Sequence, residues 1–316
     1  MALQRYRLVT RSDFDGLVCG MLLRDLDLID EIKFVHPKDM QDGIVPITER
    51  DIVTNLPYVP GCHLAFDHHS SEVARKDGRS FPNHVIDASA PSAARVVFDY
   101  YGGAGAFPKV GAELMAAVDK ADSAQFSRDE ILDPTGWVLL NFLMDPRTGL
   151  GRFRDFRVSN YDLMMQLVER CRDMTVDEVL ALPDVRERVD LYRAHRALSE
   201  AQIRRCTAVH GKLALIDLRG EETIHAGNRF MVYALFPQCD VSAHVMWGLK
   251  GQNTVFAIGK SILDRGSTVD VGAVCLGYGG GGHGAAGTCQ VANERAEAVK
   301  AELIAALKGA PLKAAA

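Results

Sequence analysis

Residues 5–23 read RYRLVTRSDFDGLVCGMLL, which is a short apolar run, a polar turn and a second apolar segment. Arg5–Thr10 predicts a strand. From Gly16 to Ile29 the apolar side chains recur at nearly helical spacing, which predicts a helix directly after the turn. A strand that leads straight into a helix is typical of α/β folds, in which ligands gather at the carboxyl ends of the strands.

The rest of the N-terminal part continues this alternation. Further strands are expected at Ile32–His36, Asp51–Asn55 and His63–Phe66, and further helices at Ser92–Tyr101 and Lys109–Lys120. Strands that alternate with helices predict an α/β fold whose mostly parallel sheet is covered on both faces.

The length of 316 residues favours two domains, at roughly 100–200 residues per domain. The middle of the chain has few glycines and a capping-box pattern at Thr175–Glu178, which predicts a helical connector. Another layer of helices on the first domain would also fit. Strand-like segments then return, and an amphipathic helix closes the chain: Leu213–Asp217, Val241–Trp247, Thr254–Ile258 and 293–307. We expect a domain over residues 1–158, a connector over 159–207 and a smaller C-terminal α/β domain over 208–316.

Composition excludes several classes of protein. The 36 basic and 41 acidic residues give a net charge of −5, which disfavours a protein that binds duplex DNA through its phosphates. The seven cysteines are scattered and form no C-x-x-C pair, which argues against a disulfide framework and favours a cytoplasmic location. No apolar run reaches the roughly 18 residues of a membrane span, and the first residues contain no signal-peptide core.

Asp13 and Asp15 lie between the first strand and the first helix. In extended backbone, residues two apart point the same way at roughly 6–7 Å. Two carboxylates held in this way repel each other unless a cation lies between or beside them, which indicates a site for Mg²⁺ or Mn²⁺. The same residues would also fit a simple turn.

Asp67-His68-His69 follow directly after the strand His63–Phe66. Histidine is a standard ligand of divalent transition metals, and a neighbouring carboxylate can fix its tautomer. Because parallel strands end at the same edge of a sheet, these residues and Asp13 and Asp15 together favour a metal site over a solvated polar loop.

The stretch Gly279–Gly287 reads GGGGHGAAG. Consecutive glycines let the backbone approach a ligand closely, with amide groups free to face an anion, and a histidine there can donate to phosphate. Ala285-Ala286-Gly287 is interpreted as the start of a helix. We favour a phosphate-binding loop over a flexible linker.

These three motifs, in this order and spacing, resemble the DHH phosphoesterase family over nearly the whole chain. Ser12–Gly16 is similar to its first motif, Asp67–His69 to the motif that names it, and Gly279–Gly287 to the GGGH loop of the DHH-associated C-terminal domain. The resemblance implies two domains that face each other across an active cleft. The N-terminal domain would hold divalent metals, usually Mn²⁺, and the C-terminal domain would bind the substrate.

The resemblance also implies roles for the N-terminal residues. Asp13 and Asp15 would each bind a different metal. His68 would bind the metal held by Asp15, Asp67 would orient it, and His69 would face the scissile phosphate, so that His69 and Asp67 are the predicted catalytic residues. The fourth motif fits Ala121–Phe126, which makes Asp122 the predicted ligand and Asp119, three residues earlier, its rival.

In the C-terminal half, Lys260-Ser261 stands where relatives often have Arg-Ser, and Arg265 follows. The resemblance implies that these residues contact the substrate, together with the glycine loop at Gly280, Gly281, Gly282 and His283. Asn228 and Arg229 are weaker candidates. The basic stretch Pro146–Arg154 fits a phosphate contact, a subunit contact or a solvated loop.

Two positions depart from the family pattern. Asn55 stands where relatives have an aspartate that bridges two metals, and Val9 stands where they often have a histidine. An amide oxygen carries no charge and bridges two cations poorly. We therefore expect Mn²⁺ or Mg²⁺, one or two per chain. The second would be weak, or completed by Asp119, His36, His63 or substrate oxygens.

The leading hypothesis is a metal-dependent phosphoesterase that acts on short nucleotides, of the nanoRNase, phosphoadenosine-phosphate or cyclic-dinucleotide type. An exopolyphosphatase or pyrophosphatase is the alternative within the enzyme class. A nucleotide-binding sensor with a weakened metal site is the alternative outside it. The expected partner is a small nucleotide or short oligonucleotide, with neither duplex DNA nor a membrane, and the resemblance leaves a homodimer open.

Overall fold

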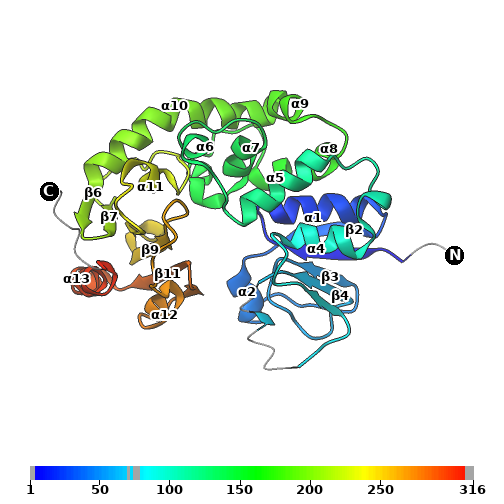
Figure 1. Cartoon of the computed structure of the whole chain (residues 1–316), viewed down its shortest axis with the longest axis horizontal. Helices are drawn as coiled ribbons and strands as arrows, with labels where there is room; N and C mark the ends of the chain where they lie inside the picture. Colours follow the sequence, from blue (N-terminus) through cyan, green and yellow to red (C-terminus); the bar gives the residue numbers. More distant parts are fainter. Residues whose placement is uncertain (1–3, 70–71, 74–78, 310–316) are drawn as a thin grey trace. The chain divides into compact units, whose positions relative to one another are not determined.

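The computed structural model describes residues 4–69, 72–73 and 79–309. The chain separates into two compact units, Met1–Gln125 with Pro134–Leu191, and Phe126–Asp133 with Tyr192–Ala316. The division falls within the long helix α10 (Pro183–Cys206). Figure 1 shows the elements of each unit in sequence colours.

The first unit begins with alternating strands and helices and ends in helices. Its strands are β1 (Tyr6–Thr10), β2 (Ile29–Phe34), β3 (Asp51–Thr54), β4 (Leu64–Asp67) and β5 (His84–Ile86). Its helices are α1 (Phe14–Asp25), α2 (Pro37–Gln41), α4 (Ala93–Tyr100), α5 (Ala112–Asp122), α7 (Gly136–Met144), α8 (Asn160–Arg170), α9 (Val176–Ala181) and the first part of α10, with 3₁₀ turns η1 (Gly103–Gly105), η2 (Pro146–Thr148) and η3 (Leu150–Arg152).

The described strands of this unit form a five-stranded sheet in the order β2-β1-β3-β4-β5. Every neighbouring pair is parallel, which confirms the expected α/β fold. Leu8 faces α1, where its side chain lies next to Gly20, and Val9 faces the opposite side with Val53 and Ala65. Both faces of the sheet are therefore buried, and Figure 1 shows α1 and α4 together on one of them.

Helix α1 begins at the polar turn because Asp13 caps it, accepting a hydrogen bond from the backbone N–H of Gly16 at 3.0 Å. A side chain at position 16 would overlap the carbonyl oxygen of Arg11, so the turn requires glycine. The helix ends at Asp25, earlier than the expected Ile29, because Asp27 adopts a left-handed conformation with φ of 56°. Strand β2 accordingly begins at Ile29 instead of Ile32, pairing with Tyr6 of β1.

The second unit contains a mixed sheet. Its strands are β6 (Thr207–His210), β7 (Leu213–Asp217), β8 (Val241–Trp247), β9 (Thr254–Lys260), β10 (Gly281–His283) and β11 (Ala286–Val291). Its helices are α6 (Arg128–Leu132), the rest of α10, α11 (Met231–Leu235), α12 (Val271–Leu276) and α13 (Ala296–Leu307), with 3₁₀ turns η4 (Leu249–Gly251) and η5 (Asn293–Arg295). Within the described part of the chain, six strands pair in the order β10-β11-β9-β8-β7-β6.

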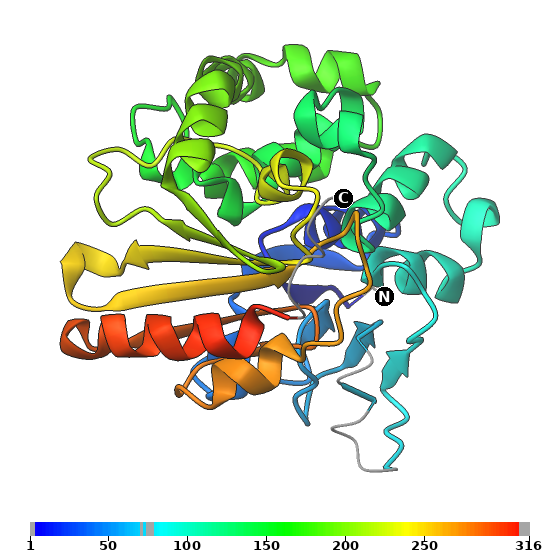
Figure 2. The ribbon, with the colours of Figure 1, turned by 60° about the vertical axis from the view of Figure 1, so that its left-hand side comes forward.

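One apolar core holds this unit together. Buried residues of β7, β8, β9 and β11 pack with α12 and α13, among them Val245, Phe256 and Leu303. Figure 2 shows α13 lying along the strands. Residues 126–133 join this unit because Phe126 packs on Phe230 with ring centres 5.8 Å apart.

The prediction of a helix that begins at Ala285–Gly287 is wrong. Ala286 begins β11, which pairs antiparallel with β9 and forms a hairpin with β10. The alternation of buried and exposed side chains favours a strand here, because Cys289 and Val291 are buried while Gln290 between them is exposed.

No helix in the described part of the chain is both long enough and apolar enough to cross a membrane.

The glycines of the β10–β11 hairpin differ in the room around them. At Gly280 a new Cβ would lie 2.7 Å from Cα of Cys289, whereas at Gly284 nothing lies within 4 Å. Gly280→Ala is expected to destabilise the protein by about 2 kcal/mol, as overpacking of a tight site does. Gly284→Ala serves as the control and is expected to have the same melting temperature as the natural protein. Equal melting temperatures for both variants in calorimetry would contradict this packing.

Candidate metal centre

The carboxyl ends of three adjacent strands bring the predicted metal-site residues to one edge of the first sheet. Asp13 and Asp15 follow β1, Asn55 follows β3, and Asp67 is the last residue of β4. These strands are neighbours in the order β1-β3-β4. The sheet topology therefore gathers motifs that lie more than fifty positions apart in the sequence.

Asp15, His68 and Asp122 offer ligand atoms that all lie within 4.8 Å of one another. Asp15 stands in the first turn of α1, His68 directly after β4, and Asp122 at the end of α5. Two carboxylates and an imidazole are a donor set that suits Mn²⁺ and related divalent cations.

The Asp15 carboxylate is buried against the start of α4. It accepts hydrogen bonds from the backbone N–H groups of Ala93 at 3.1 Å and Ala94 at 2.8 Å. These donors belong to the positive end of the helix, which favours an anion. Burial, with the nearby charge of Asp122, nevertheless raises the pKa of Asp15 to about 8.

His68 is fixed on both sides of its ring. Its Nδ1 lies 3.3 Å from the carbonyl oxygen of Ala90, and its Nε2 lies 2.8 Å from Oδ2 of Asp122. Burial opposes protonation, but Asp122 and Asp15 raise the pKa of His68 to about 9. The pKa of Asp122 is lowered, because contact with His68 outweighs its burial.

Unpartnered buried atoms test whether these residues fit a metal. Nε2 of His68 lies 2.8 Å from Asp122 but forms no hydrogen bond of good geometry there. Oδ1 of Asn55 is also buried without a partner at the same edge of the sheet. A buried polar atom left in this way is costly unless something binds it, so the group of Asp15, His68 and Asp122 fits a divalent cation.

The Asp67 carboxylate orients His69. Its Oδ1 lies 2.7 Å from Nδ1 of His69 and accepts from the backbone N–H groups of His68 at 2.8 Å and His69 at 3.3 Å. The resemblance implied that Asp67 acts on His68. The structure instead places the carbonyl of Ala90 against the His68 ring.

Asp119 and Asp122 have separate partners. Asp119 pairs with Arg95 of α4 at 2.6 Å and accepts a hydrogen bond from Ser92 at 2.8 Å. Asp122 belongs to the group with Asp15 and His68. Helix α5 therefore carries one aspartate for an ion pair with α4 and one for the metal centre.

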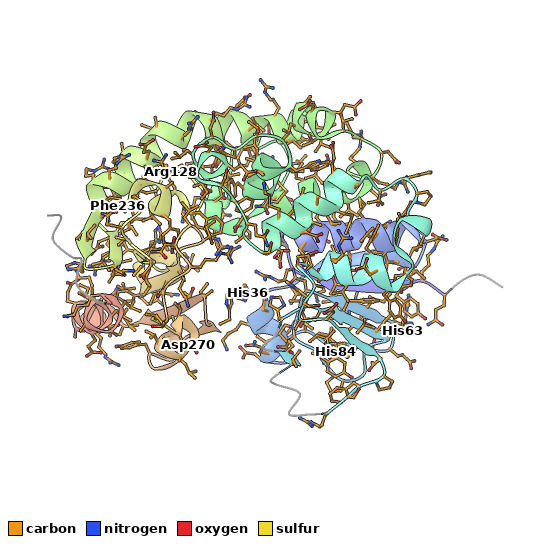
Figure 3. All side chains as sticks on the ribbon, viewed as in Figure 1. His36, His63, His84, Arg128, Phe236 and Asp270 are labelled. Atoms are coloured by element: carbon orange, nitrogen blue, oxygen red, sulfur yellow. The ribbon has the colours of Figure 1, made fainter. Side chains whose placement is uncertain are left out.

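His36 and His63, both labelled in Figure 3, do not belong to this group. His36 follows the carboxyl end of β2 and caps α2, where its Nδ1 accepts from the backbone N–H of Lys38. His63 precedes β4, at the opposite end of the strands, and stacks on Tyr6 with ring centres 3.9 Å apart. Neither joins the three-ligand group.

The predicted substrate residues of the second unit surround the hairpin and the end of β9. The ammonium of Lys260 donates to the carbonyl of Val269, and Ser261 is buried, where its hydroxyl accepts from the backbone of Leu263 and Asp264. Arg265 donates to the carbonyl of Ile262. His283 is exposed, and its Nδ1 accepts from the backbone N–H of Ala285.

The glycine run has more than one structural role. At Gly280 and Gly282 a side chain would collide with β11, so these two glycines allow close packing of the hairpin. A Cβ added at Gly281 would meet nothing within 4 Å, so this glycine, which pairs with Thr288 of β11, is not required by close packing. Asn228 is buried, and its amide donates to Ile131 and Tyr192, a structural position.

Sequence reasoning missed the backbone groups that surround the metal centre. The N–H groups of Ala93 and Ala94 and the carbonyl of Ala90 leave no signature in residue type. The N-cap Ser92 followed by two alanines is a helix-start signal that could have placed an anion-binding end near Asp15.

No protein-family model and no curated protein sequence matches the chain. Among solved structures, the pGpG-specific phosphodiesterase PggH from Vibrio cholerae is 61% identical, with a TM-score of 0.81. The match covers 95% of this chain and 98% of PggH. The chain belongs to the DHH phosphoesterase family.

More distant DHH structures share the fold alone. The exonuclease RecJ bound to manganese is 17% identical with a TM-score of 0.52, covering 97% of this chain and 91% of that one. RecJ from Thermus thermophilus in complex with Mn²⁺ is 16% identical with a TM-score of 0.50, covering 97% and 52%. As a DHH phosphoesterase, the protein is a hydrolase of phosphate esters with a candidate site for a divalent metal.

Metal binding should release protons. The pKa of Asp15 is raised to about 8 and that of His68 to about 9, which favours their protonated forms near neutral pH, and each group must lose its proton to become a ligand. Mn²⁺ binding at pH 7 is therefore expected to displace a measurable number of protons, and binding should tighten as the pH rises toward 9. Calorimetric titration in buffers of different ionisation enthalpy measures this number. Equal affinity at pH 6.5 and pH 8.5 would contradict it.

Two aspartates of α5 provide a matched pair of variants. Asp122→Asn removes a ligand charge and is expected to weaken Mn²⁺ binding by more than about tenfold. Tenfold is the lower end of the loss seen when a residue that hydrogen-bonds a metal ligand is mutated. Asp119→Asn breaks the ion pair with Arg95 and is expected to lower the melting temperature while leaving Mn²⁺ binding intact. The reverse pattern in binding isotherms would make Asp119 the ligand.

Proposed function

We propose that this protein is a metal-dependent phosphodiesterase that hydrolyses pGpG. The observation that carries the proposal is the 61% identity to a pGpG-specific phosphodiesterase across 98% of that protein. The group of Asp15, His68 and Asp122 supports it, because the family resemblance implies a divalent metal in this unit and these residues offer its ligands. Among the three nucleotide types expected from the sequence, a short linear dinucleotide is the one that this relative favours.

Asp15, His68 and Asp122 would hold Mn²⁺ or Mg²⁺, with Mn²⁺ preferred because imidazole is among the ligands. A cation bound there would supply Lewis-acid activation of the phosphate ester. Asp15 would be held ready by the two N–H groups of α4, which fix the direction of its oxygens.

His69 would contact the scissile phosphate. Its Nδ1 is engaged by Asp67, so Nε2 is the ring nitrogen left to reach a phosphate oxygen. Burial opposes protonation of His69, but the contact with Asp67 raises its pKa and favours the charged, donating form. A charged imidazole next to a phosphate that gains negative charge stabilises the transition state.

The second unit would bind the nucleotide. Lys260, Arg265 and His283 carry donors suited to phosphate, and the exposed glycines of β10 would let a ligand approach closely. In this proposal residues 1–158 hold the metal, 159–207 connect, and 208–316 bind substrate. The seven free cysteines favour a cytoplasmic location, and the resemblance leaves a homodimer open.

Turnover of pGpG with Mn²⁺ tests the function, with pyrophosphate, polyphosphate and a cyclic dinucleotide offered beside it. The protein is expected to release GMP from pGpG. His68→Ala should lower the rate more than about 100-fold. Mutation of a residue that only hydrogen-bonds a metal ligand already lowers metal affinity or activity about 10–100-fold, and loss of the ligand itself should cost more. His36→Ala is the matched control, because His36 caps α2, and it should retain full activity.

Other outcomes point to the alternatives. Preferred cleavage of polyphosphate or pyrophosphate would replace pGpG with a phosphate chain. Tight pGpG binding without GMP release, from a folded protein, would indicate a sensor.

A further inference from the structure

The Asp13 carboxylate is surrounded by N–H donors. Its Oδ1 accepts from the backbone N–H of Gly16 at 3.0 Å and from Nδ2 of Asn55 at 3.3 Å. Its Oδ2 lies 3.2 Å from Nε of Arg11. Only 15% of the Asp13 side chain is exposed. Both oxygens are therefore engaged by neighbouring groups of the protein, and Asp13 does not join the described group of Asp15, His68 and Asp122.

Asn55 is suited to this arrangement by its lack of charge. It is buried directly after β3, with a φ of 55° and its backbone N–H bound to the carbonyl of Phe66. A carboxylate neighbour requires a donor, so the amide nitrogen faces Asp13. An aspartate at this position would place two carboxylates within about 3.3 Å, an arrangement that needs a cation between them.

Arginine supplies the positive charge near Asp13. The guanidinium of Arg11 contacts Asp13 and also interacts electrostatically with Asp122. Arg147 is held by Asp145 at 2.7 Å and also interacts electrostatically with Asp13 and Asp122. A guanidinium is always charged, and its fork of donors matches carboxylate and phosphate oxygens.

We propose that Arg11, together with Asn55, takes the place of a second metal ion. The protein would bind one divalent cation, at Asp15, His68 and Asp122, and the Arg11 guanidinium would neutralise Asp13 where another cation would otherwise be needed. This inference rests on the proposed metal centre. Arg11 acts as a positioning residue, because it holds Asp13 and fixes a positive charge beside the metal ligands.

The number of cations per chain tests the proposal. Native mass spectrometry and equilibrium dialysis with Mn²⁺ are expected to give one cation per chain for the natural protein and none for His68→Ala. The variant Arg11→Gln/Asn55→Asp removes the guanidinium and restores a second carboxylate. It is expected to bind two, and electron paramagnetic resonance should then show a spin-coupled Mn²⁺ pair.

Thermal unfolding gives a second readout on single variants. Without metal, Asn55→Asp is expected to melt several degrees below the natural protein, and Mn²⁺ should raise its melting temperature more than that of the natural protein. Arg11→Lys is expected to keep the stoichiometry of one, because a charge remains beside Asp13.

Specific results would overturn the proposal. Two cations bound to the natural protein would show that Arg11 replaces nothing, and a stoichiometry of one in Arg11→Gln/Asn55→Asp would show that these residues do not exclude the second. Binding of one cation, lost in His68→Ala, without hydrolysis of pGpG would refute the proposed function and leave this inference standing.

Discussion

The N-terminal unit depends on one buried carboxylate. Asp15 ties the first turn of α1 to the first turn of α4, two helices that begin 79 positions apart along the chain. Without those two N–H donors, a carboxylate with almost no exposure would have neither hydrogen bonds nor a favourable helix end. The same contact fixes the direction in which Asp15 faces His68 and Asp122. In the proposed metal centre, folding and metal binding would therefore share a single interaction.

The parallel sheet adds the second constraint. Because β1, β3 and β4 all end at one edge, Asp13, Asn55 and Asp67 meet there without any specific contact being required to draw them together. Each then finds a different partner: Asp13 an arginine, Asn55 the Asp13 carboxylate, and Asp67 the His69 ring. A common edge thus holds residues with distinct chemical tasks only a few ångströms apart.

The sequence was sufficient for the fold class and for the position of the motifs, because strand-to-helix alternation and the Asp and His motifs are local patterns. It was not sufficient for choices that depend on a partner far along the chain. Asp119 and Asp122 share a helix at a spacing of three, and only the position of Arg95 on α4 separates them. The orientation of His68 rests on the backbone of Ala90, which any residue could supply. Ala285–Gly287 begins no helix, because pairing with β9 outweighs local preference.

The Arg11–Asp13 pair affects how occupancy of the proposed metal site depends on the concentration of a scarce metal. A site that needs two cations responds to their concentration cooperatively and fails when either is removed. If a guanidinium takes the place of one cation, occupancy of the site by the other cation follows a simple hyperbola against the concentration of that cation. Chelation then strips one ion and leaves Asp13 neutralised, so the emptied site keeps its shape and can be reloaded in a single step.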